Sequence, residues 1–163
     1  VQSTRAGDLD AAAVTYLMEK EGLSPHEMED ILNRESGWLG ISGISDDMRE
    51  ITAKISTDDR ARLAVQAASY RAKKYVGAYT AAMGGIDLLV FSGGVGENSP
   101  LLRSEICKNM GFFGIQLDEA KNEDFREQGV ISAPESKVKV IVINTDEEIE
   151  IARDTYAVVK RNA

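Results

Sequence analysis

A glycine cluster and three charged stretches are the parts of this sequence that could carry chemistry. The cluster reads FSGGVGENS (residues 91–99) and follows an apolar run. Glycines at the carboxyl end of a buried strand let a flat ligand or another backbone approach closely, because no side chain stands in the way. A strand-to-helix turn that needs positive φ predicts the same residues, so both interpretations stay open on composition alone.

Two known phosphate-binding patterns do not fit the glycine cluster. A Walker-type loop ends in Gly-Lys-Ser/Thr, and the cluster has no lysine. A dinucleotide fingerprint needs G-x-G-x-x-G, whereas Gly93, Gly94 and Gly96 are followed by Glu, Asn and Ser. The helix expected from residue 99 onward would still favour a polar or anionic group at its free N–H groups.

The charged stretches hold side chains of the kinds that bind phosphates and metal ions. Arg5 lies in STRAGD (3–8), and its guanidinium suits phosphate oxygens, although a surface ion pair with a nearby aspartate also explains it. In SDDMRE (45–50), the Ser-Asp pair could simply cap a short helix. Glu147 lies in the first turn of an expected helix, where it could hold Mg²⁺ or only stabilise the helix dipole. Taken singly, each stretch favours the structural explanation.

Composition excludes several classes of function. The 163 residues are 43% apolar and 28% charged, as expected of one globular domain with a core. The formal net charge of −8 argues against general binding to nucleic acid or to an anionic membrane. The single cysteine, Cys107, allows no internal disulfide, and His26 alone leaves little material for a zinc site. The longest apolar runs are far shorter than the ~20 residues of a membrane span, so we expect a cytoplasmic protein.

Alternating helical and strand patterns indicate an α/β fold with helices on both faces of the sheet. Helices are expected at residues 10–21, 25–36, 57–83, 99–111 and from 145 on, the last opened by a capping box at Thr145. A glycine-punctuated loop is expected at 37–45, and the continuous apolar runs at 86–92 and 137–144 predict strands covered on both faces. Two strands are few for such a sheet, and the sequence begins with Val1 rather than Met. We therefore expect a fragment.

Five motifs, in this order and spacing, resemble the carboxyl-terminal part of the acetokinase family, within the actin, Hsp70 and sugar-kinase superfamily. They are TRAGDLD, SGWLGISGISDDMRE, FSGGVGENSPLLR, FFGIQLD and INTDEEIEIARDT. The fold so implied is part of an actin-like (ribonuclease H-like) ATPase domain, with helices packed on a mostly buried sheet that is incomplete here. Residues 1–144 would be the C-terminal nucleotide-binding domain without its first strands, and 145–163 a helix that packs on the absent N-terminal domain.

The resemblance also implies roles for particular residues. Arg5 would stabilise the transferring phosphoryl group, and Glu147 would hold Mg²⁺ or Mn²⁺. ATP or ADP would lie against two elements, formed by Asp47, Met48 and Arg49 and by Gly94, Val95, Gly96, Glu97 and Asn98. The glycine cluster would then lack side chains so that a purine base can occupy their space.

The activity so implied is reversible transfer of the ATP γ-phosphoryl group to acetate, giving acetyl phosphate and ADP, by a homodimer. Propionate and butyrate kinases of the family share the pattern, and a non-catalytic nucleotide-binding or dimerisation module is a further alternative. The family's phosphate loop and acetate-side residues have no counterpart here, so we expect the 163-residue segment alone to be inactive. Departures from the family pattern, which bear on loop detail and efficiency, are Ala6, Ala11, Trp38 and Ser92.

Overall fold

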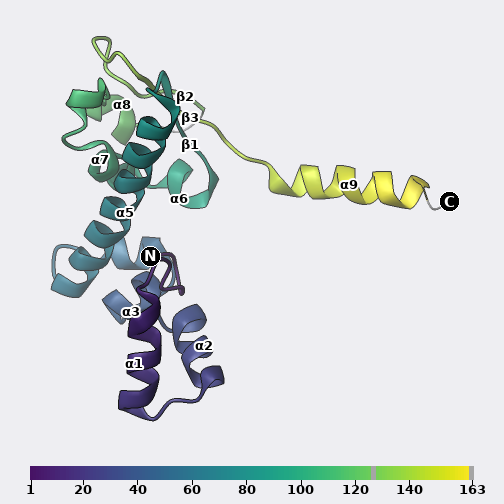
Figure 1. Cartoon of the computed structure of the whole chain (residues 1–163). Helices are drawn as coiled ribbons and strands as arrows, with labels where there is room; N and C mark the ends of the chain where they lie inside the picture. The colour runs from purple at the N-terminus through teal and green to yellow at the C-terminus, as the bar shows by residue number, and fades with distance from the viewer. Residues whose placement is uncertain (126–127, 162–163) are drawn as a thin grey trace.

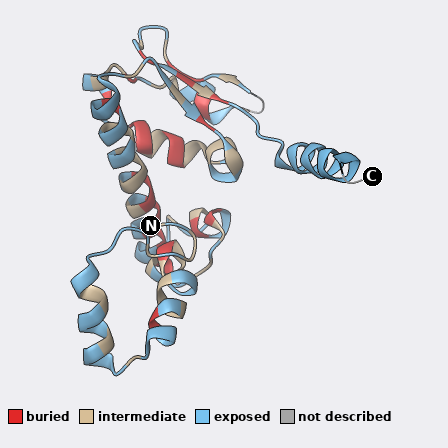
Figure 2. Ribbon diagram, turned by 45° about the vertical axis from the view of Figure 1, so that its right-hand side comes forward, coloured by how far each residue is buried: buried red, intermediate tan, exposed pale blue. Residues whose placement is uncertain are grey.

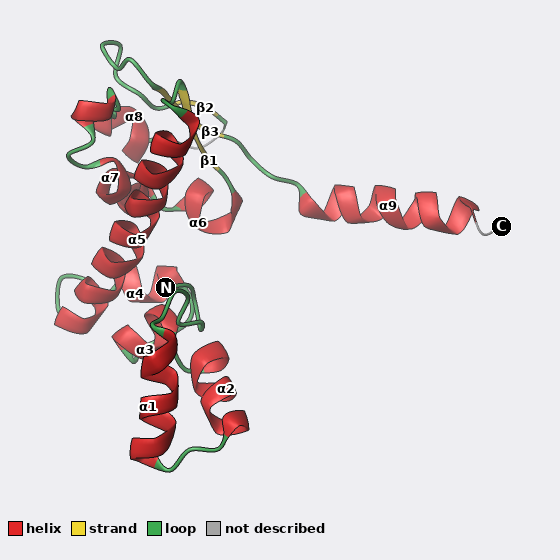
Figure 3. Ribbon diagram, viewed as in Figure 1, coloured by secondary structure: helices red, strands yellow, loops and turns green. Residues whose placement is uncertain are grey.

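The computed structural model describes residues 1–125 and 128–161, which are mostly helical with a small sheet near one end (Figures 1 and 3). The helices are α1 (Ala11–Glu21), α2 (Pro25–Arg34), α3 (Gly37–Ser42), α4 (Met48–Thr52), α5 (Asp59–Met83), α6 (Gly93–Asn98), α7 (Pro100–Cys107), α8 (Glu119–Glu123), α9 (Glu147–Arg161) and the 3₁₀ helix η1 (Gly111–Phe113). The strands are β1 (Leu88–Phe91), β2 (Gly129–Val130) and β3 (Lys139–Val142). No helix in the described part of the chain is both long and apolar enough to cross a membrane.

The first two helices begin where the sequence predicts. The carboxylate of Asp10 accepts the N–H of Ala12 at the start of α1. Ser24 and Glu27 form the predicted capping box of α2, each side chain accepting the other residue's backbone N–H. Helix α2 ends at Arg34, however, and the prediction that it runs to residue 36 is wrong.

Residues 37–42 form helix α3, so the loop predicted at 37–45 is wrong for this part. Gly37 begins α3 with φ +63°, and a Cβ there would lie 2.1 Å from the carbonyl oxygen of Gln2. The N-terminal segment is bonded to α3 at this point, because Trp38 N–H donates to Gln2 O (2.9 Å) and Leu39 N–H to Ser3 O (3.0 Å). The glycine therefore serves a close backbone approach, and this approach fixes the segment that carries Arg5.

Helix α5 passes through two hydrophobic cores (Figure 2). Its first half packs with α3 and α4 around a core that includes Met48, Ile51, Ala61, Ala64, Val65, Ala68 and Leu102. Its second half lies with α7 against the sheet, whose core includes Phe91, Ile106, Cys107, Met110, Val140 and Val142. The nucleotide-related segments predicted from the sequence follow α3 and β1, one beside each core.

The sheet has the order β1-β3-β2, with β1 parallel and β2 antiparallel to β3. Within the described residues, the prediction that helices cover both faces is wrong. Leu88 and Val90 of β1 are 45% and 42% exposed, whereas Phe91 is buried against α7. The reason is that α5 and α7 pack on one face, while α9, which follows β3, extends away from the sheet (Figure 1).

Cys107 offers a probe of the sheet core. Its thiol is buried, and this burial raises its pKa to about 12. Because the thiolate is the reactive form, we expect iodoacetamide to label the folded chain very slowly at mildly alkaline pH and the chain in guanidinium chloride rapidly. Mass spectrometry of the labelled chain measures the difference. Equal rates in both conditions would contradict the packing of α7 on the sheet.

Candidate functional site

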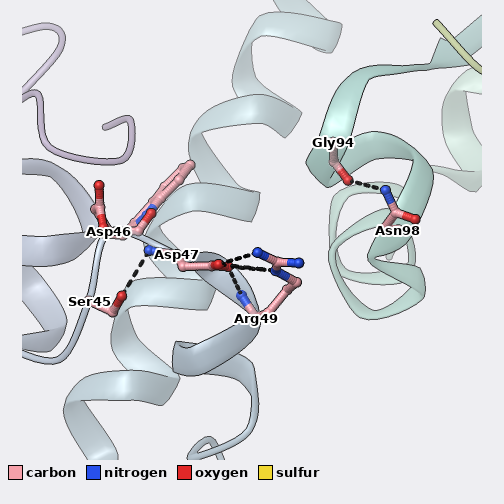
Figure 4. Close-up of polar contacts among 7 residues, drawn as sticks. Ser45, Asp46, Asp47, Arg49, Gly94 and Asn98 are labelled. Atoms are coloured by element: carbon pink, nitrogen blue, oxygen red, sulfur yellow. Dashed lines mark hydrogen bonds and ion pairs between the residues drawn. The ribbon is translucent and has the colours of Figure 1, made fainter. Parts of the chain in front are cut away.

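Two elements far apart in the sequence line one pocket of about 1080 Å³. One element is the start of α4 and the other is α6, and Figure 4 shows them on opposite sides of the intervening space. The residues that they contribute are Asp47, Met48, Arg49, Gly94, Val95 and Asn98. The structure therefore brings together most of the residues that the sequence assigns to a nucleotide.

Asp47 organises the α4 side of the pocket. Its Oδ1 accepts the backbone N–H of Arg49 (2.9 Å) and so caps α4, whereas Ser45 Oγ accepts the N–H of Asp47 (3.0 Å). The possible Ser-Asp cap at 45–46 is thus wrong, because the cap is one residue later. Arg49 also donates from its guanidinium, through Nε to Oδ1 (3.0 Å) and Nη2 to Oδ2 (2.5 Å).

The Asp47–Arg49 pair stays ionised over a wide pH range. Hydrogen bonds from Arg49 lower the pKa of Asp47 to about 2, and the same contacts raise the pKa of Arg49. No residue that the structure describes accepts a hydrogen bond from Arg49 Nη1. This nitrogen can therefore donate to a ligand without breaking the ion pair.

The α6 side of the pocket is a short helix, which the helical patterns in the sequence do not predict. The three glycines of α6 differ in backbone conformation and in what a side chain would meet. Gly93 has φ +70°, which favours glycine, and a Cβ at Gly96 would lie 3.4 Å from the backbone of Phe91. Gly94 has no positive φ, and a Cβ there would meet nothing within 4 Å. Gly94 lines the pocket, so its missing side chain enlarges the pocket and serves no close contact among the described residues.

The other polar residues of α6 point in two directions. Asn98 lines the pocket, and its Nδ2 donates to Gly94 O (2.9 Å), so Oδ1 can accept from a ligand. Gly96 and Glu97 are not among the residues that line the pocket. Glu97 instead accepts hydrogen bonds from Thr145 and Gly93, and those from Thr145 are the main cause that lowers the pKa of its carboxyl group.

Arg103 holds α6 from behind and is fully buried. Its Nη1 donates to the carbonyl oxygens of Gly96 (2.9 Å) and Glu97 (2.8 Å). Its Nε and Nη2 donate to Oδ1 (2.7 Å) and O (2.9 Å) of Asn122. Burial lowers the pKa of Arg103, and none of the ion pairs found among the described residues involves it, so carbonyl-type oxygens replace its water shell.

The buried position of Arg103 was not predicted, although the spacing of its neighbours in the sequence indicates it. The arginine falls at helical spacing in an apolar stripe with Ile106, Cys107 and Met110. A charge inside such a stripe predicts a buried, fully bonded side chain, because an unpaired buried charge is too costly. Trp38 and Glu123 also line the pocket, and no local pattern marks them.

Arg5 lies outside this pocket. Its segment is bonded to the end of α2, with Ala6 N–H donating to Leu32 O (2.9 Å) and Thr4 Oγ1 to Asn33 O (2.8 Å). The Arg5 side chain is exposed and has no hydrogen bond or ion pair with any residue that the structure describes. Its guanidinium is thus available to a ligand, but the described residues do not bring it to the pocket.

Glu147 is the exposed first residue of α9 and is likewise absent from the pocket lining. The predicted capping box is wrong, because Asp146 caps α9 by accepting the N–H of Ile149 (3.0 Å) and Thr145 bonds to Glu97. No cluster of three or more metal-binding side chains occurs within residues 1–125 and 128–161. A lone carboxylate fits Mg²⁺ only when phosphate oxygens and water supply the other ligands.

Comparison with known proteins decides the family. Residues 1–153 match the model of the acetokinase family. The chain belongs to this family. The chain is 50% identical to the acetate kinases of Phocaeicola vulgatus and Thermotoga maritima, over 162 and 165 residues. In each case the match covers 99% of this chain and 41% of the relative.

Solved structures agree with this acetokinase-family assignment. A crystal structure of Porphyromonas gingivalis acetate kinase matches with a TM-score of 0.89 and 52% identity, covering 96% of this chain and 40% of that chain. A propionate kinase from Francisella tularensis matches with a TM-score of 0.85 and 35% identity, covering 93% and 39%. The predicted α/β fold of the actin-like ATPase type is therefore confirmed. The chain spans about two fifths of the length of these relatives.

Proposed function

We propose that this chain supplies the nucleotide-binding part of an acetate kinase, which reversibly transfers the ATP γ-phosphoryl group to acetate and gives acetyl phosphate and ADP. The observation that carries this proposal is the pocket between α4 and α6, because it joins both predicted nucleotide elements. The acetate kinases at about 50% identity support the reaction class.

In this proposal the base lies against Gly94 and Val95. Gly94 leaves the space that a flat ring needs, and Asn98 Oδ1 can accept a hydrogen bond from the exocyclic amine of adenine. Arg49 Nη1 donates to the ribose or to a phosphate, while its other nitrogens hold Asp47. Gly96 and Glu97 act through the shape of α6 rather than by touching the nucleotide.

Phosphoryl transfer demands mainly positioning of oxygens and neutralisation of charge from the protein. We assign the stabilisation of the transferring group to Arg5 and the binding of Mg²⁺ or Mn²⁺ to Glu147. The bound metal ion would neutralise phosphate charge. Both side chains are exposed, and Arg5 has no partner in the described structure, so each is available to a substrate. Their convergence on the phosphates requires the part of the relatives that this chain does not span.

The exposed apolar surfaces support two further parts of the proposal. Helix α9 has no buried residue, and its exposed apolar side chains are Ile149, Ile151, Tyr156, Val158 and Val159. We assign residues 145–163 to contacts with an N-terminal domain of the kind found in the complete enzyme, and residues 1–144 to the nucleotide-binding domain. On α5, the exposed side chains of Tyr75, Tyr79 and Met83 follow one another at four-residue spacing and form a candidate homodimer face of a cytoplasmic enzyme.

The acid substrate is a separate question. The likeness to a propionate kinase favours propionate as a second candidate, with butyrate as a related alternative. The pocket described above concerns the nucleotide, so it does not discriminate among acids. Turnover on acetate, propionate and butyrate, measured with a chain of the relatives' full length that carries this segment, decides among them.

Calorimetry with ADP and Mg²⁺ tests the nucleotide site directly. We expect the 163-residue chain to bind ADP but to form no acetyl hydroxamate from acetate, MgATP and hydroxylamine, because the acid-side residues of the family are absent. Hydroxamate formation would contradict the expected inactivity of the segment. A lack of ADP binding would contradict the assignment of the pocket.

A further inference from the structure

Glu97 joins two segments that lie far apart in the sequence. A single carboxylate oxygen, Oε1, accepts hydrogen bonds from Gly93 N, Thr145 N and Thr145 Oγ1, each at 2.8 Å. Gly93 begins α6 directly after β1, and Thr145 lies between β3 and α9. Because β1 and β3 are parallel neighbours, their carboxyl ends meet at one edge of the sheet, where Glu97 connects the chains that leave them.

The bonds to Glu97 are the last connection of α9 to the rest of the described chain. Ile143 N–H donates to Phe91 O (2.9 Å), which extends the strand pairing by one residue. Beyond Ile143, the hydrogen bonds and ion pairs of residues 144–161 stay within that segment, apart from the two from Thr145 to Glu97. Helix α9 buries no residue, so packing does not fix its start either.

We propose that Glu97 is a positioning residue that ties the start of α9 to α6. Through Thr145 it places Glu147, two residues further on, relative to the short helix that carries Gly94 and Asn98. Hydrogen bonds to an ionised carboxylate are stronger than neutral ones, which suits a connection made by one side chain. The consequence for catalysis rests on the proposed function, in which α6 holds the base and Glu147 the metal ion; the connection itself does not.

Four variants separate this role from general destabilisation. Glu97→Ala removes all three hydrogen bonds, and Glu97→Gln keeps the shape and one acceptor oxygen but loses the charge. Thr145→Val removes only the hydroxyl donor and leaves Gly93 and α6 untouched. Ser104→Ala is the matched control, because Ser104 Oγ makes a similar bond to Glu119 Oε1 (3.0 Å) away from α6 and α9.

Amide hydrogen exchange of the 163-residue chain, followed by NMR, tests the connection without any ligand. We expect the amides of Gly93 and Thr145 to exchange at least about tenfold faster in Glu97→Ala than in wild type, because each loses its acceptor. Glu97→Gln should be intermediate, and Ser104→Ala should match wild type. Equal exchange in wild type and Glu97→Ala would overturn the inference.

Calorimetry with ADP, with and without Mg²⁺, tests the positioning role in a chain of the relatives' full length that carries this segment. We expect Mg²⁺ to strengthen ADP binding by wild type and Ser104→Ala. Thr145→Val should keep the metal-free affinity within about twofold and lose part of the Mg²⁺ gain, because it removes one of the two hydrogen bonds from residue 145 to Glu97 and alters only the α9 side. An undiminished gain in Thr145→Val and Glu97→Ala, or no gain in wild type, would overturn the positioning role. If wild type binds no ADP, the proposed function fails, and amide exchange still decides whether Glu97 holds α9.

Discussion

Replacing Gly94 by leucine should weaken ADP binding by about 10- to 100-fold without loss of folding stability. The fold tolerates a side chain here, because a Cβ at Gly94 meets nothing within 4 Å and its φ is not positive. Leucine also favours a helix over glycine by roughly 0.5–1 kcal/mol. The nucleotide should not tolerate it, because the new side chain fills the space of the base, and overpacking of an occupied space costs about 1–3 kcal/mol.

Two other glycines provide the controls for Gly94→Leu. Gly111 is also free of positive φ and of neighbours within 4 Å, but it lies in η1, so Gly111→Leu should leave ADP binding unchanged. Gly93→Leu forces a side chain onto a φ of +70° and should lower the melting temperature. Calorimetry gives the affinities and thermal unfolding gives the stabilities. Unchanged ADP affinity in Gly94→Leu would mean that the missing side chain of Gly94 does not make space for the base.

The glycine cluster shows how much of the site could be predicted from the sequence. Composition left a turn and a ligand-binding surface equally open, and the structure gives Gly93 a positive φ and places Gly94 at the pocket. Positive φ explains Gly93, a Cβ at Gly96 would make an ordinary contact with the backbone of Phe91, and Gly94 faces open space. These reasons depend on φ and on neighbours that only the folded chain supplies. The motif therefore predicted where the element that follows β1 lies, and only the structure showed that its glycines have different environments.

Local signals predicted the starts of α1 and α2 better than the environment of the strands. Ser24 and Glu27 form their capping box because both partners lie within one turn. By contrast, the apolar run that contains Leu88 and Val90 was predicted to be covered on both faces, yet both residues are more than two fifths exposed. Coverage depends on where distant helices pack, and within the described residues α9 does not return to the sheet (Figure 1).

Long-range polar contacts could not be predicted from the sequence. Thr145 was predicted to cap α9, since it precedes acidic residues at the right spacing, but its hydroxyl and N–H bond to Glu97. A local pattern cannot reveal a competing acceptor that is 48 residues away. The cap passed to Asp146, whose carboxylate accepts the N–H of Ile149, while the Thr145 hydroxyl donates to Glu97.

Replacing Arg103 by methionine should destabilise the chain by about 3 kcal/mol. The change leaves oxygens of Gly96, Glu97 and Asn122 without their donor, and each unsatisfied buried group costs about 1–3 kcal/mol. Relief of the buried cation's desolvation offsets part of this loss. For a chain of this size the melting temperature should fall by about 6–12 °C. Thermal unfolding followed by circular dichroism measures the shift.

Two further arginine variants show whether the loss comes from the hydrogen bonds of Arg103. Arg103→Lys keeps the charge but not the planar fork, so it should satisfy fewer of the four acceptors and lie between wild type and methionine. Arg153→Met removes an exposed arginine paired with Glu150 on α9 and should change stability by less than about 0.5 kcal/mol.

The same variants also test the pocket, because Arg103 donates to the carbonyl oxygens of Gly96 and Glu97 in α6. Arg103→Lys should weaken ADP binding at temperatures where the chain is still folded, whereas Arg153→Met should not. An Arg103→Met chain as stable as wild type would mean that water reaches these carbonyls, and α6 would then need another explanation for its fixed position.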